Sequence, residues 1–181
     1  MWHVRATRLT RLLFTLGWCC LLPTAALAQV ADVRIKAAFL VNFAKFAEWP
    51  AEAFAGADTP LAICVVGKDP FGDNLKPGPI GKREVRVLRA VQESAFKECH
   101  VAYFAESEDR RLPQLLRAVR KLPVLTVSDI EGFAEAGGML GLVQNDDRLQ
   151  FEVNRDAATE AGLRLSSQLL KLARAVRETR R

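Results

Sequence analysis

The chain has 181 residues, of which 50% are hydrophobic and 26% charged, and its formal net charge at pH 7 is +5. This length fits a single domain with a sizeable buried core. Residues 1–28 carry Arg5, Arg8 and Arg11 and no acidic residue. The remaining chain has 23 of the 26 basic residues and all 21 acidic residues, so its formal net charge is about +2. A balance of about +2 without a clustered basic face gives no basis for nucleic-acid binding, and we expect no nucleic acid among the partners.

The N-terminal residues have the pattern of a secretory signal peptide. Three arginines precede an apolar run from Leu12 to Leu22, which is too short to span a bilayer comfortably. Ala26-Leu27-Ala28 then forms an A-x-A cleavage motif. We therefore expect cleavage after Ala28 and export to the periplasm, with residues 29–181 forming one domain. The alternative is an uncleaved membrane anchor. No later apolar run is long enough to cross a membrane.

Two cysteines remain after the leader, Cys64 and Cys99. An even pair in an exported protein favours a disulfide, which would stabilise the fold by roughly 3–4 kcal/mol in the chain-entropy model. A reactive thiol or a metal ligand is the alternative. With His100 as the one histidine of the mature chain, this is a poor zinc site, and we expect no metal.

The first predicted element after the leader is a helix over residues 32–48 that ends before Pro50. Its apolar residues fall at helical spacing, and Phe39, Phe43 and Phe46 occupy a neighbouring face. The combined apolar arc is wider than one sheet contact needs. Either the helix is wedged between the sheet and a second helix, or part of the phenylalanine face meets a partner protein.

Strands and helices alternate in the rest of the chain. The continuous apolar run from Leu61 to Gly67 predicts a strand buried on both faces. Further strands are expected over residues 84–88, 99–105, 124–127, 139–143 and 149–153, the last two as an antiparallel hairpin. Helices are expected briefly after Gly67, over residues 109–121, from Asn154 to Gly162, and from Ser166 or Ser167 through Val176 towards the C-terminus. The predicted fold class is α/β, a mostly parallel sheet with an antiparallel C-terminal hairpin and helices on both faces.

The sequence contains no convincing catalytic set. Cys99 and His100 are neighbours on a predicted strand, so their side chains point to opposite faces and a nucleophilic dyad is disfavoured. Nucleophile-elbow, zinc-protease and dinucleotide-binding motifs are missing from the sequence. We expect a protein that is not an enzyme and has no cofactor.

Four blocks of sequence resemble the YfiR family. They are residues 36–50 (KAAFLVNFAKFAEWP), 63–72 (ICVVGKDPFG), 151–154 (FEVN) with 161–163 (AGL), and 165–173 (LSSQLLKLA). The blocks stand in the family's order, and the resemblance extends over nearly all of the mature chain.

The resemblance implies a periplasmic α/β protein without enzymatic activity. The family's repressor binds the periplasmic sensor domain of an inner-membrane diguanylate cyclase, and an outer-membrane-associated lipoprotein can sequester it. The resemblance also implies cyclic-di-GMP output with biofilm control, a possible homodimer, and a disulfide between Cys64 and Cys99. Ala134 and Gly141 stand where the repressor has a second disulfide.

The sequence therefore suggests two candidate functions, of which the first is favoured. The first is a periplasmic regulatory binding protein that represses a membrane-bound diguanylate cyclase. The residues expected to contact the partner are Phe39, Phe43, Trp49, Phe71 and Phe151. The second is a small-ligand binding module that serves another membrane sensor, with a pocket at the carboxyl ends of the parallel strands near Gly67 to Phe71.

Overall fold

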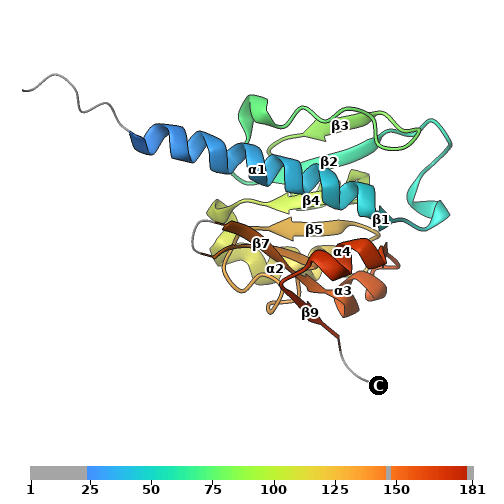
Figure 1. Ribbon diagram of the computed structural model, residues 1–181. Helices are drawn as coiled ribbons and strands as arrows, with labels where there is room; N and C mark the ends of the chain where they lie inside the picture. Colours follow the sequence, from blue (N-terminus) through green and yellow to red (C-terminus); the bar gives the residue numbers. More distant parts are fainter. Residues whose placement is uncertain (1–23, 146–147, 179–181) are drawn as a thin grey trace, which may run out of the picture.

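The computed structural model describes residues 24–145 and 148–178, which form a seven-stranded sheet with helices on both faces (Figure 1). The sheet strands are β2 (Leu61–Val66), β3 (Val85–Leu88), β4 (Val101–Phe104), β5 (Leu125–Ser128), β6 (Leu140–Asn145), β7 (Arg148–Asn154) and β9 (Ala175–Arg177). The α-helices are α1 (Thr24–Phe46), α2 (Leu112–Val119), α3 (Arg155–Glu160) and α4 (Ser167–Leu172). Short 3-10 helices are η1 (Ala51–Ala53), η2 (Gly72–Asn74), η3 (Glu93–Glu98) and η4 (Glu106–Arg111). Strands β1 (Ala47–Glu48) and β8 (Arg164–Leu165) form a separate antiparallel pair.

The sheet confirms the predicted fold class. Its strand order is β3-β2-β4-β5-β6-β7-β9, and every neighbouring pair is parallel except the hairpin β6-β7. All six residues of β2 are buried, as the unbroken apolar run from Leu61 predicts. β2 lies between β3 and β4, where Ile63 pairs with Val87 on one side and Val101 on the other. A strand with neighbours on both edges and helices on both faces needs apolar side chains at every position.

Two apolar layers hold the helices against the sheet. The larger layer lies under α1 and takes in Ala158 of α3 and Leu169 of α4. The second lies under α2 on the opposite face and includes Leu115 and both cysteines. In Figure 1, α1 runs across the front of the sheet and α2 lies behind it. Alternating residues of the parallel strands serve the two layers, which is why the strands read as continuous apolar runs.

The first helix is longer at its N-terminus than the sequence predicts. It begins at Thr24 rather than at Asp32, and it ends at Phe46, where Ala47 and Glu48 pair with β8. Residues 1–23 of the predicted leader lie outside the described residues, while residues 24–28 belong to α1. The predicted cleavage after Ala28 thus falls within this helix and stays a prediction. Among the described residues, no helix has the length and hydropathy needed to cross a membrane.

Two predicted helices are shorter than expected. After Gly67 the chain forms only the 3-10 helix η2, because Pro77 and Pro79 leave no room for further turns. The helix predicted over 109–121 is divided into η4 and α2, and α2 begins at Leu112 with a proline in its first turn. Other starts are as predicted: Asn154 caps α3 by accepting from Ala157 N, and Ser166 caps α4 by accepting from Leu169 N.

The prediction for the C-terminal helix is wrong beyond Leu172. The expected helix continued through Val176, and its apolar residues Leu172 and Val176 were expected to face the core, but these residues are 71% and 41% exposed. The backbone becomes extended at Ala173, and the following residues form β9, which pairs in parallel with β7. These main-chain hydrogen bonds occupy the edge of β7, which a continued helix would have left without a partner strand.

Candidate functional site

The aromatic residues expected to contact a partner lie mainly inside the protein. Phe43 and Phe151 are 1% and 5% exposed, and their ring centroids are 5.0 Å apart. Phe39 is half-buried and completes the cluster, at 5.6 Å from Phe43 and 5.9 Å from Phe151. Phe71 is also buried, with its ring 4.7 Å from that of Tyr103. The phenylalanine face of α1 thus packs on the sheet, where Phe39 and Phe43 contact Phe151 of β7. Binding of a partner protein by this face stays a prediction.

Trp49, the fifth residue of that set, joins a second aromatic cluster at the amino ends of the strands. Its indole Nε1 donates to the carbonyl of His100 at 3.1 Å. The ring of Phe54 stacks on His100 with centroids 4.2 Å apart, and the Arg83 guanidinium lies 3.8 Å from the Phe54 centroid. Arg83 also donates to the carbonyls of residues 56, 57 and 59. Arg83 and His100 therefore hold the loop from Pro50 to Pro60. Both contact the ring of Phe54 in that loop, and Arg83 also binds three of its carbonyl groups.

His100 is a buried structural residue with both ring nitrogens engaged. Nδ1 accepts the backbone N–H of Ala62 at 3.0 Å, so Nε2 must carry the proton that it shares with the carbonyl of Ala53 at 3.0 Å. Burial lowers the pKa of His100, and the nearby charges of Arg83 and Arg86 lower it further, against an opposing contribution from the Ala53 carbonyl. The neutral ring is thus the form that this site accommodates.

Cys64 and Cys99 are joined by a disulfide with Cα atoms 5.8 Å apart, which is normal geometry for such a bond. Cys64 lies in the middle of β2, and Cys99 lies just before β4, the strand that pairs with β2. Both are buried beneath α2. The bridge therefore joins β2 to the residue that leads into β4, the neighbouring strand.

An ionic network at the carboxyl ends of the strands was not predicted from the sequence. Lys36 Nζ lies 2.8 Å from Asp32 and 3.0 Å from Asp129, and the Tyr103 hydroxyl donates to Asp129 at 2.6 Å. Burial alone would lower the pKa of Lys36, but its hydrogen bonds to the two carboxylates outweigh this and raise it. Burial is the main cause that raises the pKa of Tyr103, and the negative charge of Asp129 raises it further. The network fastens α1 to β4 and β5. The i,i+4 spacing of Asp32 and Lys36 was its only visible signal.

A small hollow lies at the carboxyl end of β2, where a ligand pocket was expected. Its volume is about 260 Å³, and its walls include Lys68, Arg111 and Glu93. The strand order β3-β2-β4 places a topological switch point here, the usual position of ligand sites in open α/β sheets. Arg111 is already paired with Glu93 at 2.9 Å and Glu108 at 3.0 Å. The expected location therefore contains a hollow, but Arg111 in its wall is already paired with Glu93 and Glu108.

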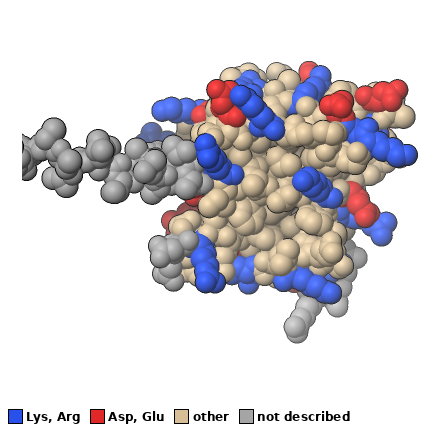
Figure 2. Space-filling model, turned by 45° about the horizontal axis from the view of Figure 1, so that its top comes forward, with Lys and Arg blue, Asp and Glu red and all other residues tan. Residues whose placement is uncertain are grey.

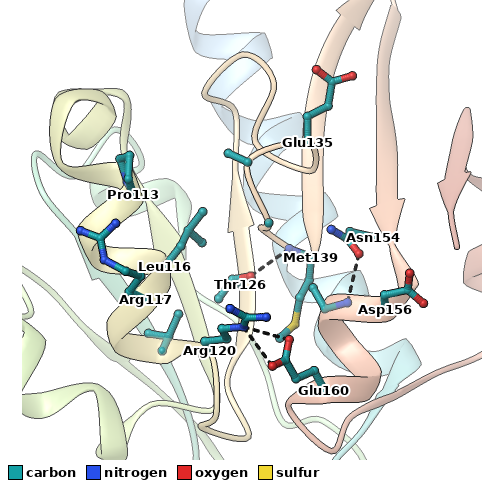
Figure 3. Close-up of a pocket in the computed structure, with 14 residues that line it drawn as sticks. Pro113, Leu116, Arg117, Arg120, Thr126, Glu135, Met139, Asn154, Asp156 and Glu160 are labelled. Atoms are coloured by element: carbon teal, nitrogen blue, oxygen red, sulfur yellow. Dashed lines mark hydrogen bonds and ion pairs between the residues drawn. The ribbon is translucent and has the colours of Figure 1, made fainter. Parts of the chain in front are cut away.

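A larger cleft of about 470 Å³ opens between α2 and α3, and sequence reasoning missed it. Figure 3 shows Arg117 and Arg120 on the α2 wall, with Asp156 and Glu160 on the opposite side. Arg120 bridges the two walls by donating to both carboxylate oxygens of Glu160, at 2.9 and 3.0 Å.

The base of this cleft includes the buried side chains of Met139 and Val119. Met139 is 3% exposed, and its backbone N–H donates to the Thr126 hydroxyl at 2.9 Å. On the far wall, the side chain of Asn154 donates to the Ala134 carbonyl while it caps α3. Opposite charges over such a base could hold a small molecule that carries both an apolar body and ionic groups. No group of three or more His, Cys, Asp or Glu in the described part of the chain could hold a metal ion.

The YfiR/HmsC-like family model matches residues 33–174, from Val33 within α1 to Arg174, the residue before β9. The chain belongs to the YfiR/HmsC-like family. This is a regulatory rather than a catalytic family, and the disulfide agrees with a protein that works outside the cytoplasm. The family assignment made from the four sequence blocks is therefore confirmed.

Solved structures show the same kind of fold. One is described as the ABC domain in complex with L-Trp from Streptococcus pneumonia. The match has a TM-score of 0.50 and 10% identity, and it covers 78% of this chain and 62% of that one. The present chain thus spans less than two thirds of that protein. At this identity the likeness concerns the fold alone.

Proposed function

We propose that this YfiR/HmsC-like protein is a periplasmic repressor of a membrane-bound diguanylate cyclase. It acts by binding the cyclase's periplasmic sensor domain and shifting it toward the inactive state. The observation that carries the proposal is the family match, which extends from Val33 within α1 to Arg174, just past α4. An outer-membrane-associated lipoprotein and a second copy of the chain are its further candidate partners.

In this proposal the predicted aromatic residues divide into two groups. Phe39 and Trp49 are half-buried and keep part of their surface for a partner. Phe43, Phe71 and Phe151 are buried, so they support binding by fixing α1 and the strand ends in position.

The test is the cyclic-di-GMP concentration in the native host. Deleting the gene should raise it, and returning the full-length chain should lower it again. A chain that lacks residues 1–28 is the matched control, because it keeps the folded domain in the cytosol and should not restore repression. Cyclic-di-GMP that stays unchanged after deletion and after complementation would exclude a diguanylate cyclase as the target.

A second candidate function is small-ligand binding in the cleft between α2 and α3. Two observations favour it: the opposed charges over an apolar base, and a protein of similar fold that was solved in complex with L-Trp. A ligand that binds only the folded state raises the melting temperature, so thermal shift against L-Trp, other amino acids and vitamins is the direct test. Arg117→Glu should abolish a shift that arises in the cleft, and Lys68→Glu one that arises in the hollow beside β2.

A further inference from the structure

Helix α1 has an outer stripe that is chemically unlike its aromatic inner face. Arg34, Ala38, Val41 and Lys45 follow each other at intervals of three or four residues, so they lie along one side of the helix. All of them are exposed except Val41, which is half-buried. This stripe and the segment 74–78 enclose a groove of about 320 Å³. Figure 2 shows a broad area of uncharged surface with Lys and Arg side chains around it, and with Asp and Glu side chains grouped along its upper and right margins.

The charge of the groove has one sign. Arg34, Lys45 and Lys76 line it, and its lining contains no carboxylate. Lys76 is paired with Asp73 at 3.0 Å, but these side chains are 71% and 95% exposed. Such an exposed pair contributes little to stability, so Lys76 can exchange its partner at small cost. The groove therefore favours an acidic occupant.

The base of the groove is apolar. Ala37, Ala38 and Val41 form it on the helix side, and Pro77 contributes from the opposite wall. Small side chains there leave the space that larger apolar side chains of another chain could fill. On the turn beside Arg34, Ile35 is 48% exposed and extends the apolar surface. An occupant thus needs apolar side chains as well as negative charge.

The length of the stripe suits a helix. From Arg34 to Lys45 the helix rises by roughly 16 Å, or about three turns. Helix-in-groove recognition uses apolar anchors at i, i+3 or i+4, and i+7, which span two turns. A bilayer is flat on this scale and would touch the charged rim without filling the base.

We propose that the groove between α1 and residues 74–78 is the docking site for an acidic amphipathic helix of the membrane sensor. The assignment rests on the regulatory function proposed above and adds the surface and the chemistry of the partner. The apolar base binds the helix, while the three cations steer it and set its orientation.

The experiment places a photo-crosslinking amino acid at Ala38 in the full-length protein, in living cells of the native host. Matched sites are Leu172 on α4 and Ala136 beside the cleft, both exposed and outside the groove. We expect Ala38 to crosslink to an inner-membrane protein, within a segment that mass spectrometry shows to be acidic and amphipathic.

Charge reversal supplies the second readout. The double variant Lys45→Glu with Lys76→Glu should reduce the Ala38 crosslink at least tenfold. Lys121→Glu, an exposed reversal outside the groove, should leave it unchanged. The melting temperatures of both variants, compared with the wild type, show whether the fold is intact.

Each other outcome is decisive. Crosslinks to a membrane protein from Leu172 or Ala136 but not from Ala38 would refute the groove and leave the regulatory function standing. Crosslinks from Ala38 to lipid, to a second copy or to a basic segment would also refute the proposed occupant. If none of the three sites reaches a membrane protein, the groove assignment fails, whereas the regulatory function is decided separately by the cyclic-di-GMP measurement described above.

Discussion

His100 should make the stability of this protein sensitive to mild acid. In the folded protein Nδ1 accepts from Ala62 and Nε2 donates to Ala53, so a second ring proton would remove an acceptor and leave the Ala62 N–H without a partner. The pKa of His100 is lowered on folding, whereas in the unfolded chain it lies near 6.5. Below that value the unfolded chain binds the proton more readily, and the free energy of unfolding falls until the folded pKa is reached.

The size of the effect follows from proton linkage. One group contributes at most about 1.4 kcal/mol per pH unit, and only between the folded and the unfolded pKa. His100→Asn should cost roughly 1–3 kcal/mol near pH 7.5, since two hydrogen bonds worth about 0.5–1.5 kcal/mol each are weakened. As the pH falls toward 5.5, this cost should shrink because the variant lacks the titrating ring.

The assay is urea unfolding of the wild type and of His100→Asn at half-unit steps from pH 7.5 to 5.5. The two proteins differ only at residue 100, so the difference between the two curves isolates the contribution of His100. An NMR titration, with the His100 signal identified by its loss in the variant, provides the folded pKa directly. Parallel curves, or a folded pKa at or above 6.5, would refute the reasoning.

Three further predictions concern the core and the backbone. Cys64→Ala should lower the free energy of unfolding by roughly 3–4 kcal/mol, as reducing agent should in the wild type; unchanged denaturant curves would mean that the sulfurs are not paired. Phe151→Ala should cost about 3–5 kcal/mol in urea unfolding, while Leu172→Ala, at a side chain 71% exposed, should stay within about 0.5; equal costs would contradict the assigned aromatic contact. Gly67→Ala should lower the melting temperature because φ is +88° and the new Cβ would lie 2.5 Å from the Ser107 hydroxyl oxygen in η4. Gly78→Ala, where a Cβ would meet open space, is the control that should leave the melting temperature unchanged.

Local signals in the sequence were sufficient for most of the fold. The unbroken apolar run that begins at Leu61 predicted a strand buried on both faces, because such a pattern has no exposed position. Asn154 and Ser166 predicted two helix starts, since a cap satisfies backbone N–H groups within three residues of itself. These predictions succeeded because the interactions concerned are close in sequence.

The predictions failed where a distant partner decided the outcome. Val176 stands at helical spacing from Leu172, the last residue of α4, yet the chain forms β9 over Ala175–Arg177 because β7, an earlier strand, offers an open edge. The same holds for Asp129, whose contacts with Lys36 and Tyr103 join three elements. Sequence spacing contains no information about which surfaces will meet in this way.

The sequence by itself determined the family, the α/β class and the pairing candidates Cys64 and Cys99, since each depends on residue identity or short-range pattern. Only the tertiary structure decided which face of α1 is free. The phenylalanine face is covered by the sheet, and the side that remains open carries Arg34 and Lys45. The physical reason is that an apolar arc shows how much surface a helix must bury, but not what buries it; that depends on packing against elements distant in the chain.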